Sequence, residues 1–190
     1  LGFDGIEIRG LGEEIFAVKA KPFTESELPN TVKKLKDLRL EIPCLSSGCC
    51  LKFPEKADAN YQEIVEYINL AKRLGTPYVR VLGDLEPQVT EEVDDNVVLE
   101  ALKRLIPVAE ANGVTLLIET NGVYADTSRL RGLLEHVASD AVGALWDLHH
   151  PYRYAGETPE KTVQNLGAFI KYVHIKDSVM VDGVVQYRML

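Results

Sequence analysis

The stretch Val114-Thr-Leu-Leu-Ile-Glu119 is a short apolar run that ends in an acid, and Val142-Gly-Ala-Leu-Trp-Asp147 repeats this pattern 28 residues later. Runs of this length are typical of buried strands in a parallel sheet. A third run, Tyr172-Val-His174-Ile, places a histidine 27 residues after Asp147. Each interval is long enough for a strand and a crossover helix, so the three runs predict three successive βα units.

The same alternation of short β-prone runs and amphipathic stretches extends along the whole chain. Successive runs begin roughly 28 to 38 residues apart, close to the ~31 per unit of an eight-unit barrel. An open doubly wound sheet is the alternative, but the GxGxxG fingerprint of its dinucleotide-binding form is absent. This rhythm suggests a TIM (β/α)8-type barrel, and we predict that fold once the resemblance described below is counted. The strands are expected at Gly5–Ile8, Leu40–Leu45, Tyr78–Leu82, Val114–Glu119, Val142–Asp147 and Tyr172–Ile175.

Helices are predicted between these strands. Apolar residues at helical spacing mark Tyr61–Leu74 and Val97–Asn112, and each stretch is followed by a glycine suited to the left-handed conformation after a helix. Pro107 should bend the second helix, because it lacks an N–H group. Thr158 is a typical N-cap residue, and a proline follows it, so a third helix is expected to run to about Ile170.

Composition limits the class of protein. With 190 residues, 46% of them hydrophobic, the chain can bury one substantial core, and we expect a single domain over residues 1–190. No apolar run approaches the roughly 20 residues of a membrane span, and no signal-like segment is present, so a cytoplasmic protein without a membrane partner is expected. Cys44, Cys49 and Cys50 are bunched and odd in number, which favours reduced packing residues over disulfides.

The net charge of the chain limits the class of molecule that it can bind. A net charge of −8 disfavours nucleic acid, because nucleic-acid binding draws its affinity from clustered lysines and arginines. A small polar substrate or a metal cation fits this balance better. The sequence leaves the formation of a homo-oligomer open.

Three side chains at strand ends predict a metal site. The carboxyl ends of parallel strands meet at one rim of the sheet, so equal positions on adjacent strands would bring Glu119, Asp147 and His174 together. Oxygen and nitrogen ligands without thiolate suit one divalent ion, whether Mn²⁺, Mg²⁺, Co²⁺, Fe²⁺ or Zn²⁺. The acids could instead cap the following helices. Three candidate ligands at equal positions on successive strands favour the metal site over helix capping.

Other polar residues follow the same strands. Glu7, at the end of the first predicted strand, points to the same rim if the register holds. His149 and His150 follow Asp147, and at most one of the two is expected to face a metal or substrate. Lys176 follows His174. His136 falls inside a predicted helix, where a surface role is the better interpretation.

Four motifs together resemble a known family, the xylose-isomerase-like TIM barrels, which are sugar phosphate isomerases and epimerases. The motifs are Gly-Phe-Asp-Gly-Ile-Glu-Ile (2–8), Ile-Glu-Thr-Asn (118–121), Trp-Asp-Leu-His-His-Pro (146–151) and Val-His-Ile-Lys-Asp (173–177). The resemblance spans nearly the whole chain, and it lies more in the order and spacing of the motifs than in any one of them.

The resemblance implies a divalent ion bound by Glu, Asp, His and Glu from strands five to eight. The first three ligands map onto Glu119, Asp147 and His174. His150 and Lys176 would bind substrate, and we place Glu7 with them. The implied reaction is isomerisation or epimerisation of a sugar, sugar phosphate or cyclitol by proton transfer through an enediolate, with Glu119 as a catalytic proton acceptor.

Two features depart from the family pattern. The six strands match strands two to seven, so we expect an incomplete barrel that lacks the first and last strands and the fourth ligand. A fragment of a longer protein explains this better than a truncated barrel completed by another chain or one with reduced activity, because missing strands expose sheet edges. Met180 stands where ketose 3-epimerases usually carry arginine, which weakens the case for a free ketohexose substrate.

Two other functions compete with the enzyme. One is a barrel that binds a sugar-like ligand or a partner without turnover. The other is an endonuclease-IV-like DNA repair enzyme, which shares the barrel type. Four histidines and a charge of −8 argue against the second, because a multi-metal cluster needs more histidines and DNA needs a basic face.

Overall fold

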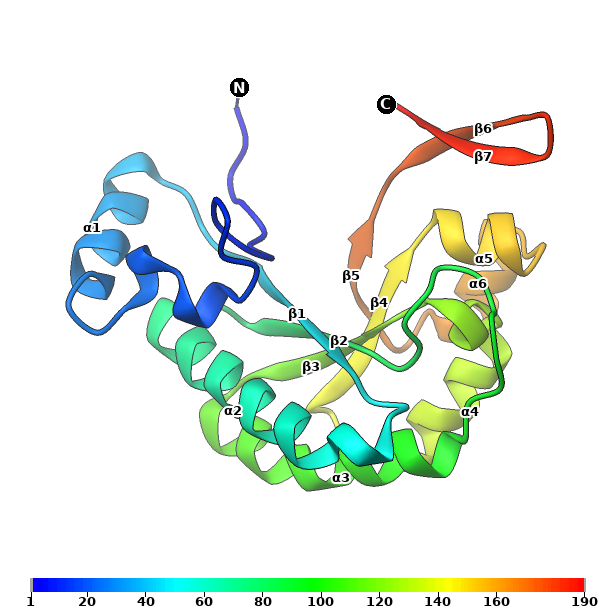
Figure 1. The fold of residues 1–190 in the computed structure, drawn as a ribbon, viewed down its shortest axis with the longest axis horizontal. Coiled ribbons are helices and arrows are strands. Elements are labelled where there is room, and N and C mark those ends of the chain that lie inside the picture. The colour runs from blue at the N-terminus through cyan, green and yellow to red at the C-terminus, as the bar shows by residue number, and fades with distance from the viewer. Residues whose placement is uncertain (1, 190) are drawn as a thin grey trace.

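The computed structural model describes residues 2–189, and its centre is a curved five-stranded parallel sheet of order β1-β2-β3-β4-β5. Figure 1 shows the helices along the convex side of this sheet, with both termini beyond the opposite, open side. Consecutive strands are neighbours and pair in parallel, as expected of βα units. The strands are β1 (Cys44–Cys50), β2 (Tyr78–Leu82), β3 (Thr115–Glu119), β4 (Val142–Asp147) and β5 (Ile170–His174).

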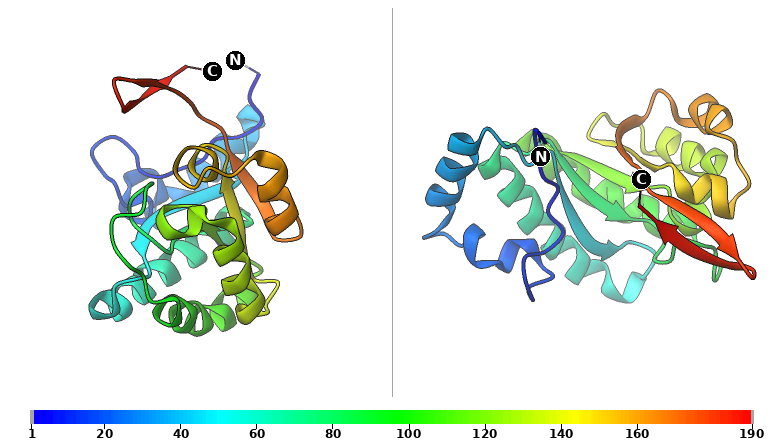
Figure 2. Two further views of the ribbon diagram at one scale, coloured as in Figure 1. Left: turned by 90° about the vertical axis from the view of Figure 1, so that its right-hand side faces the viewer. Right: turned by 90° about the horizontal axis from the view of Figure 1, so that it is seen from above.

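Helices connect the strands, and a short hairpin follows the sheet. The α-helices are α1 (Leu28–Leu38), α2 (Ala57–Leu74), α3 (Asp95–Asn112), α4 (Thr127–Val137), α5 (His149–Tyr154) and α6 (Pro159–Leu166). Short 3-10 helices are η1 (Ala17–Lys19), η2 (Lys21–Phe23), η3 (Pro54–Lys56) and η4 (Gly122–Ala125). The antiparallel hairpin of β6 (Asp177–Val181) and β7 (Val184–Arg188) extends away from the curved sheet, as Figure 2 shows. Within residues 2–189, none of the helices has the length and hydrophobicity needed to cross a membrane.

The predicted helix signals are confirmed at most positions. Gly75 and Gly113 end α2 and α3 in the left-handed conformation, with φ of 72° and 65°. The Thr158 hydroxyl accepts a hydrogen bond from the Lys161 N–H, so Thr158 is the N-cap of α6. The end predicted for this helix, near Ile170, is wrong. The helix ends at Leu166, because Ile170 already pairs with β4 as the first residue of β5.

Two predicted strands are corrected. Gly5–Ile8 forms no continuous ladder and contacts its neighbour only through isolated parallel bridges, Gly5 to Glu41 and Ile8 to Leu45. The second strand is Cys44–Cys50 instead of Leu40–Leu45. Pro43 has no N–H to donate to a ladder, and the strand continues after Leu45 because Ser46 and Cys50 pair with β2 on either side of an irregularity, which local hydrophobicity does not reveal.

The core lies between the convex face of the sheet and the helices. Leu116 and Ile118 of β3 pack in this core with Ile64 of α2 and Leu102 of α3, and all four are fully buried. Because side chains alternate along a strand, Glu119 falls on the opposite, concave face. The hydrophobic pattern that fixes the strands therefore also decides which polar residues face inward.

The barrel is open. β1 is covered on its outer side only by the isolated bridges of the N-terminal segment, and β5 is an edge strand within residues 2–189. The structure therefore confirms the prediction of an incomplete barrel of parallel strands.

Candidate active site

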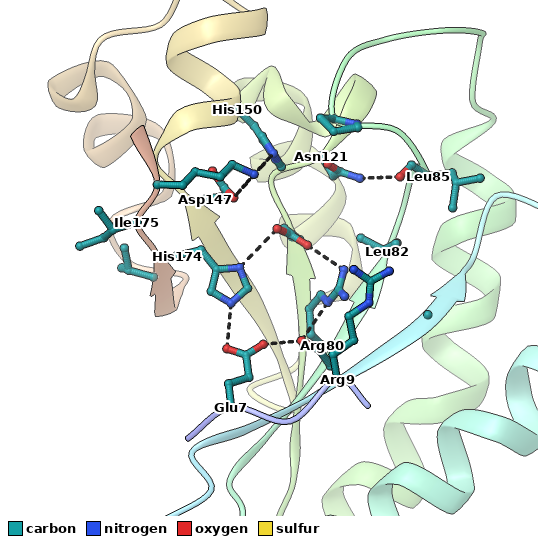
Figure 3. A pocket seen from close by; sticks show the side chains of 16 residues that line it. Glu7, Arg9, Arg80, Leu82, Leu85, Asn121, Asp147, His150, His174 and Ile175 are labelled. Atoms are coloured by element: carbon teal, nitrogen blue, oxygen red, sulfur yellow. Dashed lines mark hydrogen bonds and ion pairs between the residues drawn. The ribbon is translucent and has the colours of Figure 1, made fainter. Parts of the chain in front are cut away.

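A pocket of about 670 Å³ lies on the concave side of the sheet, at the carboxyl ends of the strands. Side chains from the N-terminal segment and from β1 to β5 line it, and Figure 3 shows how they converge. All six residues predicted to form the site, Glu7, Glu119, Asp147, His150, His174 and Lys176, are among the lining residues.

The structure brings the three predicted metal ligands together. Glu119, Asp147 and His174 end β3, β4 and β5, and each offers a ligand atom within 4.8 Å of the others. The expected equal register is wrong for one pair. Asp147 pairs with His174, but Glu119 pairs with Leu145, two residues before Asp147. Because the side-chain period of a strand is two, this stagger keeps all three side chains on the concave face.

The Glu119 carboxylate is held by two cationic groups. Its Oε2 lies 2.8 Å from Nη1 of Arg80, and its Oε1 lies 3.4 Å from Nδ1 of His174. Burial would raise the pKa of Glu119, but the contact with His174 and the charge of Arg80 outweigh it and lower the pKa to about 2. Glu119 is therefore ionised at neutral pH.

The imidazole of His174 lies between two carboxylates. Its second nitrogen, Nε2, is 2.9 Å from Oε2 of Glu7. Burial opposes the charged form, yet the contacts with Glu119 and Glu7 raise the pKa of His174 to about 9. Burial likewise works against ionisation of Glu7, whose pKa is nevertheless lowered by His174 and Ser46. In the protein without metal, His174 thus carries the positive charge that balances these acids.

Asp147 anchors a second set of contacts. Its Oδ2 is 2.8 Å from Nζ of Lys176, which is also 2.6 Å from Nε2 of His150. Nδ1 of His150 lies 3.0 Å from the Thr120 carbonyl, and a carbonyl only accepts, so Nδ1 carries a proton and Nε2 faces the lysine as an acceptor. Burial lowers the pKa of His150, consistent with a neutral ring.

The donor set fits a divalent cation. Glu119 and Asp147 are buried carboxylates, 7% and 1% exposed, and His174 adds one imidazole nitrogen. Two carboxylates and an imidazole suit the borderline and hard divalent ions predicted from the sequence. No counterpart of the strand-eight glutamate joins this cluster within residues 2–189.

The neighbouring histidines separate into different roles. His150 lines the pocket, whereas His149 does not and bonds through Nε2 to the Ser178 hydroxyl of β6 at 2.7 Å. His136 is exposed on α4, with Nδ1 2.6 Å from the Gly132 carbonyl. Met180 lies on β6, outside the pocket lining, and is 49% exposed.

Among the pocket residues that sequence reasoning missed, Arg80 and Asn121 make defined polar contacts. Arg80 is 7% exposed and stands in the middle of Tyr-Val-Arg-Val-Leu, where a charge within an apolar strand was the available signal. Asn121 stands two residues after Glu119, and its amide donates to the carbonyls of Asp84 and Leu85 at 3.0 and 2.9 Å. It thereby holds the loop after β2 against the pocket.

This parallel α/β architecture, with polar side chains gathered at the carboxyl ends of its strands, defines a TIM-barrel-type protein. The sequence model of the xylose isomerase-like TIM barrel family matches residues 1–189. The chain therefore belongs to the xylose isomerase-like TIM barrel family.

Similar proteins support this fold. A xylose isomerase-like TIM barrel protein from Mycobacterium smegmatis, solved in complex with magnesium, has a TM-score of 0.73 and 20% identity, over 98% of this chain and 67% of that one. The 3-keto-D-glucoside 4-epimerase YcjR from E. coli has a TM-score of 0.73 and 16% identity, over 93% and 70%. At these identities the likeness shows the fold.

A curated relative matches over a shorter segment. The C-glycoside deglycosidase alpha subunit of Microbacterium trichothecenolyticum is 34% identical over 96 residues, which cover 46% of this chain. The aligned part is 23% of the length of that relative. The chain thus spans about a quarter of that protein and about two thirds of the solved structures.

Proposed function

We propose that this protein forms the metal-binding part of a sugar epimerase or isomerase that depends on a divalent cation. The observation that carries the proposal is the convergence of Glu119, Asp147 and His174 in the pocket of a family member. Structures with the same fold include a keto-glucoside epimerase and a protein solved with magnesium, which supports this choice. The substrate class is a small sugar or polyol that bears a ketone beside a hydroxyl group.

Glu119, Asp147 and His174 would hold the cation. A bound divalent ion supplies a Lewis acid that polarises a carbonyl and acidifies the adjacent C–H bond. Arg80 holds one oxygen of Glu119, and Lys176 holds one oxygen of Asp147. Both carboxylates are therefore fixed in orientation before a cation binds.

His150 and Lys176 are proposed to contact the substrate. The Nδ1–H of His150 is fixed by the Thr120 carbonyl, so Nε2 is the acceptor nitrogen, and without substrate it accepts from Lys176. Lys176 presents an ammonium group beside it. Together they offer an acceptor and a donor for neighbouring substrate oxygens.

Glu119 is the proposed proton acceptor. A carboxylate is a weak base at neutral pH, whereas a general base works best with a pKa near the operating pH. Proton transfer to Glu119 therefore requires a carbon acid that is activated beside its carbonyl, which fits a ketose and not an unactivated polyol.

A related elimination is the second candidate. Both reactions remove a proton from the carbon beside the ketone. In epimerisation, a proton returns to the opposite face of that carbon. In elimination, a substituent is lost from the next carbon along the chain. The match to a deglycosidase subunit favours testing the second outcome.

Deuterium exchange tests the proposal. The protein is incubated in D₂O, with and without Mn²⁺, with ketoses, ketose phosphates, inosose-type cyclitols and keto-glycosides. We expect deuterium at the carbon next to the ketone of at least one substrate, detected by NMR, and strong loss of exchange in Glu119→Gln. A released aglycone or an unsaturated ketone left by loss of water would identify elimination, whereas an epimer would identify epimerisation.

Glu66→Gln is the matched control, because Glu66 is exposed on α2 and does not line the pocket. It should keep full exchange. Exchange that persists in Glu119→Gln would remove Glu119 from the role of proton acceptor. If no deuterium exchange is seen with any of the four substrate classes, the proposed enzyme function is contradicted and a binding function is favoured.

A further inference from the structure

Five pocket side chains are joined in a closed ring of contacts, shown in Figure 3. His174 contacts Glu7 and Glu119, Glu119 contacts Arg80, the Arg80 Nε–H donates to the Ser46 hydroxyl, and Ser46 donates to Glu7. The partners of each contact are between 34 and 167 positions apart in the sequence. The ring therefore exists only when the N-terminal segment and four strands are assembled.

The two nitrogens of His174 have different partners. The contact of Nε2 with Glu7, at 2.9 Å, has the length of an ordinary hydrogen bond, whereas Nδ1 is 3.4 Å from Glu119. Nδ1 thus faces Glu119, which is a member of the ligand cluster with Asp147. When a cation binds, the ligating nitrogen must be unprotonated and the other keeps its proton. The Glu7 contact favours Nε2 as the protonated nitrogen.

Arg80 acts on both acids of the ring. Its Nη1 holds Oε2 of Glu119 at 2.8 Å, and its Nε lies 3.2 Å from the Ser46 hydroxyl, which in turn donates to Glu7. The guanidinium is planar and Arg80 is buried, so these two contacts have a fixed relative geometry. Oε1 of Glu119, which Arg80 does not hold, is left facing His174.

We propose that Glu7 and Arg80 are positioning residues for the metal centre: Glu7 holds His174 with Nδ1 toward the cation, and Arg80 holds Glu119 with Oε1 toward it. This assignment rests on the proposed metal function. Both oxygens of Glu7 are engaged, by Ser46 and His174, so we assign Glu7 to His174 in place of the substrate contact expected from the sequence. A carboxylate that accepts the free N–H of a metal-bound histidine is a common way to fix its tautomer.

The tautomer of His174 provides a test that is read in the unsubstituted protein, with one variant used only to assign the signals. Protein labelled with ¹⁵N is loaded with Zn²⁺, which is diamagnetic, and the imidazole nitrogens are followed by NMR. His174→Gln identifies the signals. We expect a proton on Nε2 and zinc at Nδ1. A proton on Nδ1 with zinc at Nε2 would overturn the proposed role of Glu7.

Two variants test the contacts directly. Glu7→Gln keeps the shape of the side chain, and Arg80→Lys keeps the charge but loses the two-point geometry. Each should weaken Zn²⁺ binding, measured by competition with a chelating dye, by about 10–100-fold. Glu13→Gln is the control, because Glu13 is exposed in the same N-terminal region and outside the pocket lining. It should bind Zn²⁺ with unchanged affinity.

The outcomes separate this inference from the proposed function. Unchanged Zn²⁺ affinity in both folded variants, as judged by circular dichroism, would overturn the positioning roles while leaving the metal centre in place. Absence of Zn²⁺ binding by the unsubstituted protein and by Glu13→Gln would overturn both the centre and the positioning roles. Zinc binding at Nδ1 without deuterium exchange on any substrate would support the inference and contradict the proposed reaction.

Discussion

Nη1 of Arg80 lies 2.8 Å from Oε2 of Glu119, and both side chains are buried, 8% and 9% exposed. The two residues are 39 positions apart and stand on neighbouring strands of the sheet. Removal of one partner from such a pair leaves a buried charge without compensation, which costs more than the pair itself contributes. The stability of the metal-free protein should therefore depend strongly on this ion pair.

Substitution of Arg80 by methionine should destabilise the metal-free protein strongly. We expect the free energy of unfolding to fall by about 3 kcal/mol, at the lower end for a broken buried pair, because the buried Glu119 keeps only the more distant His174 as a cationic partner. Urea denaturation followed by circular dichroism measures the change. Arg104→Met is the control, since its pair with Asp58 is exposed, and it should cost about 1 kcal/mol or less. Equal losses in the two variants would contradict this reading of the buried pair.

Asp147→Asn should remove metal binding more completely than any positioning variant. Asp147 is 1% exposed and supplies an anionic oxygen to the ligand cluster, whereas asparagine supplies a neutral one. The loss of Zn²⁺ affinity should exceed the about 10–100-fold expected for an outer contact. Isothermal titration calorimetry measures it, with Asp140→Asn as a control at an exposed position before β4. Retained affinity would exclude Asp147 from the ligand set.

Gly122→Ala should disrupt the loop that follows β3. Gly122 has φ of 55°, and an added Cβ would overlap the buried Asp84 carboxylate, which accepts from the Val123 N–H at 3.0 Å. A non-glycine residue in this conformation is strained, and the overlap adds to that cost, so we expect a loss of at least about 2 kcal/mol in thermal or urea unfolding.

Gly132→Ala is the matched control for that substitution. Gly132 lies within α4, and a Cβ added there meets no atom within 4 Å. Alanine should stabilise the protein by about 0.5–1 kcal/mol, because glycine is a poorer helix former. A destabilised Gly132→Ala together with a tolerated Gly122→Ala would contradict the described geometry of both loop and helix.

The three cysteine thiols should react slowly in the folded protein. Burial raises the pKa of Cys44, Cys49 and Cys50, so the reactive thiolate is scarce near pH 8, where a free thiol of pKa about 8.5 is partly ionised. Labelling with Ellman's reagent should be slow without denaturant and rapid in urea. Rapid labelling of the folded protein would show that the thiols are accessible.

The same thiols predict an alkaline loss of stability. Because the folded state binds these protons more tightly than the unfolded state, the contribution of the thiols is fully present below the unfolded pKa of about 8.5 and is lost as pH rises above it. Unfolding free energies measured from about pH 7 to 10 should decline, and replacement of Cys44 by alanine should reduce the slope.

Much of the fold could be predicted from local sequence. The runs that became β2, β3 and β4 combine apolar residues with regular spacing, and the glycines after α2 and α3 mark helix ends. Local sequence does not reveal the strand Cys44–Cys50, because its polar residues look unlike a strand and it is defined by pairing with β2. The absence of nucleic-acid and membrane partners, and a cytoplasmic location, stay predictions from composition.

The sequence by itself determined the repeated βα unit and the three residues, Glu119, Asp147 and His174, that end successive strands, because hydrophobic periodicity is a local property of the chain. The tertiary structure alone decided the two-residue stagger between Glu119 and Asp147, the burial of Arg80 and the approach of Glu7 to His174. These depend on strand tilt and on contacts between segments up to 167 residues apart, which no local pattern encodes.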